Sequence, residues 1–282
     1  MVPPLLSIVI ANFNYGRFLE DAIRSVVEQD GFDECELIIV DGGSVDNSVD
    51  VIRKYENCIS WWVSEKDKGQ SNAFNKGFAH AKGKYLTWLN ADDVFFPGTL
   101  RKIIDLAAQK PSCEWMIGGG MRLDVELRVD SCYPARPLSR CKVEAGEVMV
   151  YGPSSIFAKS LLERVGGSVD ERFHYEMDIE LWDRFVIKGQ ARYEILPGYC
   201  WGLRLHKDAK MSGHDFDESP TSDPNHPAWR QKRREHDLIC KMYQTHPLTF
   251  FRRVFSVAIF KWFEGKWDTR RFRGRLYAEV EK

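Results

Sequence analysis

The sequence lacks several features that would place it in a common class of proteins. No apolar run is long enough to cross a membrane, and residues 1–4 lack the charged and apolar segments of a signal peptide. The seven cysteines are an odd number, and none has the C-x-x-C or His/Cys spacing of a zinc site. Together these absences predict a cytosolic protein whose thiols stay reduced.

Two nucleotide-binding motifs are also absent. The sequence contains no G-x-x-x-x-G-K-[ST] loop, which argues against a P-loop kinase or ATPase. No G-x-G-x-x-G follows the first apolar run, which argues against a dinucleotide-dependent oxidoreductase. A nucleotidyl transferase would need a basic phosphate-binding loop at that place, and residues 11–17 supply only Arg17.

The composition and periodicity that are present favour a layered α/β domain. The chain of 282 residues is 44% hydrophobic and 29% charged, as in globular proteins. Short apolar runs alternate with segments that carry apolar residues at helical spacing. This alternation predicts a mostly parallel sheet flanked by helices on both faces. The expected strands are residues 5–10, 36–40, 60–64 and 85–89.

Polar and acidic residues follow each of these four strands directly. Asn12 follows the first strand, Asp41 the second, Asp67 the third, and Asp92 and Asp93 the fourth. Open α/β sheets bind ligands at the carboxyl ends of their strands, so we expect these side chains to share one edge. Two adjacent carboxylates suit Mg²⁺ or Mn²⁺. Alternatively, Asp92 and Asp93 only favour the start of the next helix through its dipole.

Five segments follow one another along the first third of the chain: SIVIANFNY (7–15), IIVDGGSVD (38–46), SEKDKG (64–69), AFNKG (73–77) and LNADD (89–93). In this order they resemble the successive motifs of family 2 glycosyltransferases of the GT-A fold, and the resemblance covers roughly residues 5–210. It implies a Rossmann-like sheet and a nucleotide-diphosphate-sugar donor, with Asp41 near the base and Asp92/Asp93 as the metal site for Mg²⁺ or Mn²⁺. The implied donor contacts are Asn12, Asp41, Asp67, Asn75 and Asp92.

The chain departs from the family pattern at two positions. Gly42 stands where the family often has a second acid after Asp41, and Asn90 stands where it often has aspartate. Both changes remove charge, so a catalytically lapsed nucleotide-binding or scaffold protein on the same fold stays open as the alternative. Which of Asp92 and Asp93 touches the metal also stays open.

The second half of the chain supplies a candidate base. Residues 115–117 and 121–127 are expected as two strands around three glycines, and a helix is expected to begin near Asp178 and to stop at Gly189. The segment from Met177 to Trp182 resembles the second acidic motif of the family, which implies Asp178 as the general base. Glu176 and Glu180 are the nearest substitutes, and a helix-start acid without chemistry is the other interpretation.

The strand that precedes His206 suggests one further metal ligand. In related transferases an Arg-x-His at this place reaches the metal or the pyrophosphate, and the sequence has Arg204 and His206 there. A structural or solvent-facing histidine is the equal alternative. Lys210 is a weaker candidate for screening phosphate charge.

The C-terminal part changes character. From residue 230 onward there are fourteen Lys/Arg and six Asp/Glu, so this part carries +8 and the remainder −9. We expect a catalytic domain over 1–212 (donor half 1–110, acceptor half 111–212), a flexible loop or lid over 213–227, and a basic, aromatic, helical appendage over 228–282. For residues 248–263 we expect one of two arrangements: the segment packs on the catalytic domain, or it lies in a membrane interface. No nucleic-acid-binding motif accompanies them.

These observations predict a metal-dependent, inverting glycosyltransferase. It would move a sugar from a nucleotide-diphosphate-sugar to a hydroxyl of a saccharide or lipid-linked acceptor, in polysaccharide or lipid-linked oligosaccharide synthesis. We expect the protein to lie in the cytoplasm. Residues 248–263 suggest the inner face of the membrane as an alternative location.

Overall fold

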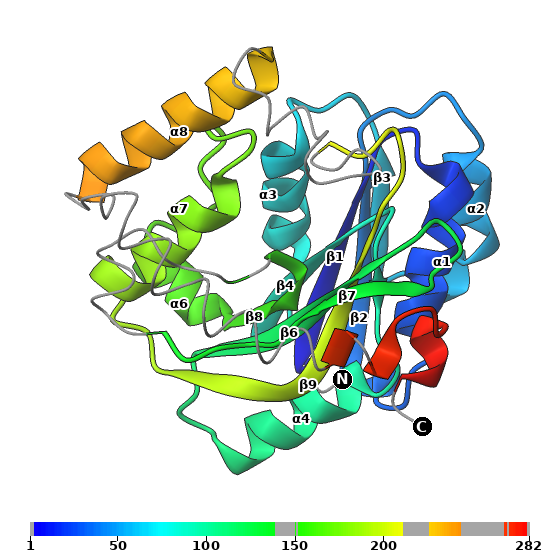
Figure 1. Cartoon of the computed structure of the whole chain (residues 1–282), viewed down its shortest axis with the longest axis horizontal. Helices are drawn as coiled ribbons and strands as arrows, with labels where there is room; N and C mark the ends of the chain where they lie inside the picture. The colour runs from blue at the N-terminus through cyan, green and yellow to red at the C-terminus, as the bar shows by residue number, and fades with distance from the viewer. Residues whose placement is uncertain are drawn as a thin grey trace.

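A computed structural model describes residues 3–138, 150, 152–210, 226–243, 268–269 and 271–280. One nine-stranded sheet, with helices packed around it, forms the body of the protein (Figure 1). The strands are β1 (Leu6–Asn12), β2 (Cys35–Asp41), β3 (Trp61–Ser64), β4 (Tyr85–Asn90), β5 (Val94–Phe95), β6 (Trp115–Leu123), β7 (Val129–Tyr133), β8 (Ser155–Ala158) and β9 (Tyr193–Arg204). The helices are α1 (Gly16–Val27), α2 (Ser48–Lys54), α3 (Gln70–His80), α4 (Thr99–Gln109), α6 (Lys159–Arg164), α7 (Met177–Asp183) and α8 (Pro227–Tyr243).

The first half of the sheet is parallel, in the order β3-β2-β1-β4. These are the four strands expected from the sequence, and the alternation with α1, α2 and α3 is confirmed. Strands β1, β2 and β4 are buried over nearly their whole length because helices cover them, which is why their sequences are apolar runs. Their registers bring Asn12 beside Asp41, and Ala11 beside Asn90.

The second half of the sheet, β8-β6-β9-β5 with β7 beside β6, contains mostly antiparallel pairs. Here one expectation was wrong: residues 115–123 form the single strand β6, which runs through the three glycines. A Cβ on Gly118 would lie 2.2 Å from Cys200 Sγ, and one on Gly120 would lie 2.6 Å from Trp201 Cε3. The glycines therefore permit β9 to pack closely on β6 instead of ending the strand.

A stack of three tryptophans fixes α7 against the sheet. The Trp182 ring on α7 stacks on Trp88 of β4 with centroids 5.4 Å apart and on Trp115 of β6 at 5.3 Å. All three side chains are almost completely buried. Burial of such large rings strongly stabilises the contact, so α7 has a defined position relative to β4 and β6.

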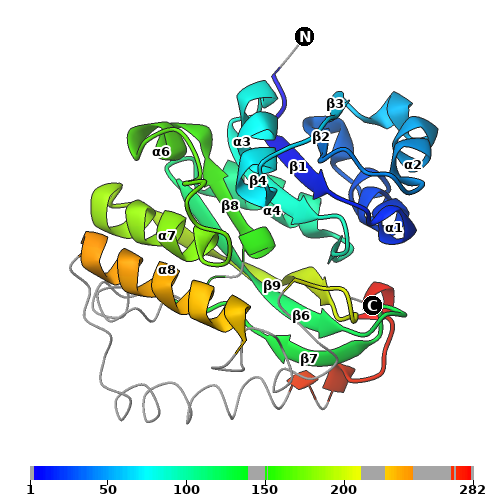
Figure 2. The same ribbon diagram turned by 90° about the horizontal axis from the view of Figure 1, so that it is seen from above.

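The described parts of the C-terminal extension both pack on the rest of the protein. Helix α8 lies alongside α7 (Figure 2). Residues 271–280 pack on the β6–β7 hairpin, where Phe272 is buried and the Val129 amide donates to the Arg275 carbonyl. The expected helical appendage is thus confirmed for α8, whereas the predictions for residues 248–263 and for the loop up to residue 225 concern segments outside the described residues. Within the described segments, no helix is long and apolar enough to cross a membrane.

Candidate active site

The carboxyl ends of β1, β2 and β3 meet around the carboxylate of Asp41. Oδ1 of Asp41 accepts hydrogen bonds from Asn12 Nδ2 at 2.6 Å and from the Ser44 hydroxyl at 2.5 Å. Oδ2 accepts from the Ser44 amide at 2.9 Å and from the Ser64 hydroxyl at 2.5 Å. Asp41 is completely buried, so it holds three strand ends together. Its expected contact with a nucleobase stays a prediction, because a nucleoside would have to replace one of these donors.

Asp67 and Phe13 form a rim beside Asp41, and their positions explain why the chain has glycine at position 42. A Cβ on Gly42 would lie 2.8 Å from Asp67 Oδ2 and 3.3 Å from the Phe13 ring. A second acid at position 42 would therefore bring two carboxylates together. Phe13 is 59% exposed, an unusual state for a phenylalanine, and it offers an apolar ring at this rim. No feature of the sequence distinguishes Phe13 from the core aromatics.

Asp92 and Asp93 differ in their surroundings. Asp93 is completely buried and accepts from Asn90 Nδ2 at 2.8 Å, Trp201 Nε1 at 3.1 Å and the Arg204 amide at 3.2 Å. Burial, and then the charge of Asp92, raise the pKa of Asp93 well above its usual value. The hydrogen bonds of Asp93 therefore link the end of β4 to β9, and Asp92 is the acid of this pair that can bind a ligand.

Asn90 suits this buried carboxylate. Its amide nitrogen donates to Asp93 while its oxygen accepts from Gln70 Nε2 at 2.6 Å. An aspartate at position 90 could not donate to Asp93 and would set two carboxylates against each other. The departure from the family pattern at Asn90 thus has a structural reason that does not require loss of catalysis.

His206 faces Asp92 across the site. Its Nε2 lies 3.0 Å from Asp92 Oδ2, and its ring packs between Tyr15 and Phe18. The Nδ1 atom is buried without a hydrogen-bond partner among the described residues. The structure thus brings His206 and Asp92 together, as the sequence predicted for two ligands of one ion.

The 3.0 Å between Asp92 and His206 is a hydrogen-bond distance, and it also matches the separation of two ligands of one divalent cation. Mg²⁺ holds its ligands at about 2.1 Å, so two neighbouring corners of its octahedron lie about 3 Å apart. Within the described residues no group of three His, Cys, Asp or Glu side chains could hold a metal. Two protein ligands are enough where phosphate oxygens and water complete the shell. Asp93, expected as a third ligand, is instead occupied by its three hydrogen bonds.

A polar chain leads from Asn90, which bonds to Asp93, toward the turn that precedes α7. Gln70, at the start of α3, donates to Asn90 and accepts from Lys210 Nζ at 3.1 Å. The same ammonium group donates to the His174 carbonyl and lies 5.3 Å from the centre of the Tyr175 ring. Burial lowers the pKa of Lys210 to about 8, against the opposing charges of Glu235 and Asp178. Sequence reasoning missed Gln70, which looks like an ordinary first residue of a helix.

Asp178 stands in the first turn of α7, near Lys210. It is half-buried, and its Oδ1 accepts from the Ile179 amide at 2.9 Å. Burial, and then the charge of Glu176, raise its pKa to about 6. No described residue donates to its second oxygen. A carboxylate with one unengaged oxygen and a pKa near 6 can take a proton from a hydroxyl at neutral pH.

The two substitutes for Asp178 are engaged elsewhere. Glu180 is buried, pairs with Arg184 at 2.9 Å and accepts from the Tyr243 hydroxyl at 2.6 Å. Glu176 is directed toward α8, 3.3 Å from His236 Nδ1. Of Asp178, Glu176 and Glu180, Asp178 is therefore the one with an oxygen available for an acceptor.

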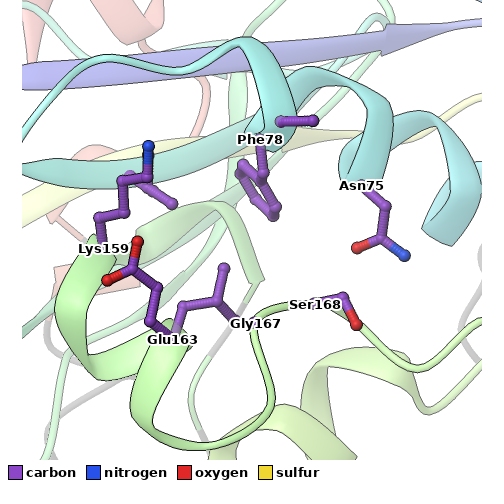
Figure 3. A pocket seen from close by; sticks show the side chains of 9 residues that line it. Asn75, Phe78, Lys159, Glu163, Gly167 and Ser168 are labelled. Carbon is purple, nitrogen blue, oxygen red and sulfur yellow. The ribbon is translucent and has the colours of Figure 1, made fainter.

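Asn75 does not lie at this site, so its expected donor contact is not supported. Its Nδ2 donates to the Val169 carbonyl at 2.9 Å, and its Oδ1 accepts from the Val169 amide at 2.8 Å. Asn75 lines a separate pocket together with Phe78, Lys159, Glu163 and Ser168 (Figure 3). The reason is its place on α3: the residue faces the loop after α6, and Gln70, five positions earlier, faces the strand ends.

Solved structures similar to this chain share its fold. S. aureus TarS residues 1–349, solved in complex with UDP-GlcNAc, matches with a TM-score of 0.59 and 16% identity, over 90% of this chain and 76% of that one. A mannosyltransferase, PcManGT from Pyrobaculum calidifontis in complex with GDP-Man and Mn²⁺, matches with a TM-score of 0.57 and 17% identity, over 87% and 66%. The expected GT-A fold is thereby confirmed.

Sequence comparison identifies the family. An uncharacterized glycosyltransferase of Nostoc sp. (strain PCC 7120) is 41% identical over 104 residues, which are 36% of this chain and 32% of the relative. The chain spans about a third to three fifths of the length of the first curated relatives it matches. The family model described as glycosyl transferase family 2 matches residues 7–165, more than half of the chain, and the protein therefore belongs to that family.

Proposed function

We propose that the protein is a metal-dependent, inverting glycosyltransferase that uses a nucleotide-diphosphate-sugar donor. The observation that carries this proposal is the pairing of Asp92 with His206 at the strand ends, with Asp178 across from it in the first turn of α7. The Asp92–His206 pair can meet a cation and diphosphate, and Asp178 can meet an acceptor hydroxyl. Gln70 and Lys210 lie between them and form a polar chain from Asn90, beside the end of β4, to the His174 carbonyl before α7. The names of the relatives and the ligands in the similar structures support the same class of reaction.

In the proposed reaction, Asp178 takes the proton of the acceptor hydroxyl as its oxygen bonds to the anomeric carbon. The bond from that carbon to the diphosphate oxygen breaks at the same time, and the electron pair leaves with the diphosphate. Direct displacement by one carboxylate-activated oxygen inverts the anomeric configuration. Asp92 and His206 would hold Mg²⁺ or Mn²⁺, which would neutralise the charge that develops on the leaving diphosphate.

The donor would lie along the ends of β1, β2 and β4. There, Phe13 offers a ring for a nucleobase, while Asn12, Asp41 and Asp67 shape the polar rim. Lys210, at the boundary with the acceptor side, would lie near the diphosphate and reduce its charge. The acceptor would approach from the start of α7, and we propose a saccharide or lipid-linked hydroxyl there.

A catalytically lapsed protein on the same fold is the competing proposal. Incubation with a panel of nucleotide-sugars and Mn²⁺ separates the two, with released nucleoside diphosphate as the readout. An active enzyme releases it slowly by hydrolysis and faster with a hydroxyl acceptor, and the Asp178→Asn variant loses most of the acceptor-dependent release. Binding of a nucleoside diphosphate without release from any donor would establish the lapsed alternative.

A further inference from the structure

Helix α8 reaches the turn that leads into α7. Glu235 Oε2 accepts hydrogen bonds from the Tyr175 amide at 2.7 Å and from the Glu176 amide at 3.1 Å. Its Oε1 accepts from Gln231 Nε2 at 3.0 Å, one turn earlier on the same helix. In Figures 1 and 2 the two helices lie side by side, so this contact is part of an extended packing.

Glu235 is not an ordinary surface acid of a charged helix. Its side chain is only 7% exposed, although most of the neighbouring charged residues of α8 face solvent. A carboxylate is costly to bury unless its oxygens are satisfied, and two backbone N–H donors provide strong, charge-assisted hydrogen bonds. In addition, α7 has no side-chain cap from its own segment. The buried carboxylate therefore fixes the backbone at residues 175–176.

The same turn carries groups of the proposed active site. The His174 carbonyl accepts from Lys210, whose ammonium group also lies over the Tyr175 ring. Asp178 follows two residues after Glu176. The turn is thus held both by Lys210, which is bonded to Gln70, and by Glu235.

The side chain of Glu176 is held by the same helix. His236 Nδ1 lies 3.3 Å from one of its oxygens and Lys232 Nζ lies 3.7 Å from the other. These contacts keep the neighbouring acid directed toward α8, while Asp178 keeps one oxygen without a described donor. Helix α8 therefore orders both the backbone and the competing carboxylate beside Asp178.

We propose that Glu235 is a positioning residue for the general base, and that α8 completes the acceptor half of the active site. This inference rests on the proposed function, since it assigns Asp178 the role of base. Glu235 touches neither donor nor acceptor. It acts by fixing the turn that precedes Asp178 and that contacts Lys210 through His174 and Tyr175.

The test compares Glu235→Ala and Glu235→Gln with Asp237→Ala as the matched control. Asp237 is an exposed acid on the same helix, where it pairs with Arg233 at 3.3 Å. Glutamine keeps an oxygen that can accept both amide bonds but loses the charge, so Glu235→Gln retains the geometry with weaker hydrogen bonds. Hydrogen exchange of the Tyr175 and Glu176 amides, donor affinity by calorimetry, and turnover with acceptor are measured on each variant.

We expect Glu235→Ala to speed exchange of these two amides and to lower kcat by roughly 10²-fold, the loss that a misplacement of about 1 Å can cause. Donor affinity with Mn²⁺ should change far less than kcat, because Lys210 keeps its hydrogen bond to Gln70. Glu235→Gln should recover most of the turnover, and Asp237→Ala should match the native protein. Native kcat in Glu235→Ala, unchanged exchange of the two amides, or an equal loss of kcat in Asp237→Ala would overturn the inference. If the native protein transfers no sugar, the proposed function fails. That outcome can be distinguished from failure of the present inference, because the amide exchange is measured without turnover.

Discussion

Asp92 Oδ2 and His206 Nε2 lie 3.0 Å apart, although 114 positions separate the two residues in the chain. Asp92 follows β4 and His206 follows β9, and the two strands come to the same edge of the sheet because β5, between Asp93 and Phe96, pairs with β9. The candidate metal position therefore requires both halves of the sheet to be assembled.

This pairing predicts different consequences for the two adjacent acids. Asp92→Ala should abolish the Mn²⁺-dependent tightening of nucleoside-diphosphate binding, measured by calorimetry with and without metal, while the melting temperature stays near native. His206→Ala should weaken the same tightening. Asp105→Ala, which removes an exposed acid on α4, is the control. Identical affinities with and without Mn²⁺ in the native protein would exclude this role for Asp92.

Replacement of Asp93 should instead reduce stability. Asp93→Ala leaves Asn90, Trp201 and the Arg204 amide without their acceptor, and each unsatisfied buried group costs about 1–3 kcal/mol. Urea denaturation should show a clearly lower free energy of unfolding than for Asp92→Ala. Equal stabilities of the two variants would contradict the division of roles between these acids.

Asp178→Asn should spare donor and metal binding but reduce turnover by roughly 10²–10⁴-fold, as expected for loss of a general base. Its pKa is raised from 3.8 to about 6, so the native base is protonated below about pH 6, and kcat/KM should fall as the pH drops through that value. Asp50→Asn is the matched control, since Asp50 is an exposed acid in the first turn of α2. Transfer at the native rate by Asp178→Asn would move the role to Glu176 or Glu180.

Phe13 and Asp41 should contribute to nucleoside binding in different ways. Phe13→Ala removes an exposed ring, so it should weaken metal-free nucleoside binding without changing the melting temperature. Asp41→Ala removes the acceptor of four hydrogen bonds, so it should lower both affinity and stability. Calorimetry and thermal melting on both variants check this pair. Native nucleoside affinity in Asp41→Ala would leave it a purely structural residue.

For residues 248–263, where aromatics stand beside Arg252, Arg253 and Lys261, the sequence leaves two alternatives open, packing on the catalytic domain and contact with a membrane. If these residues insert at a membrane interface, binding to vesicles should rise with the anionic lipid fraction and fall with added salt. Sedimentation with neutral and anionic vesicles measures it. The same amount bound to both kinds of vesicle would favour packing of this segment on the protein.

The parallel half of the sheet could be predicted from sequence because its strands are continuous apolar runs separated by amphipathic helices. The course of β6 through its three glycines could not, since the cause is the close approach of Cys200 and Trp201 from β9, far away in the chain. Local periodicity carries no information about such a partner. The same limit applies to the helix-packing contacts of α8.

Among the candidate site residues, those at strand ends could be placed because a parallel sheet aligns its carboxyl ends. The separate roles of Asp92 and Asp93 could not be distinguished, since they depend on Trp201 and Arg204 across the sheet. Asn75 was assigned from a motif, but the face that it presents depends on the loop at Val169. Gln70 and Glu235 carry no sequence signal, because their importance comes only from what they contact.

The hydrogen bond between Gln70 and Lys210 has a consequence for exchanging parts between relatives. The family match ends at residue 165, whereas Asp178, His206, Lys210 and Glu235 lie beyond it. A chimera that keeps the donor-binding strands of this protein and takes a new acceptor specificity from a relative must therefore import α8 together with α7. It must also keep a side chain at position 70 that can accept from the incoming lysine, or the two halves will be joined without their polar connection.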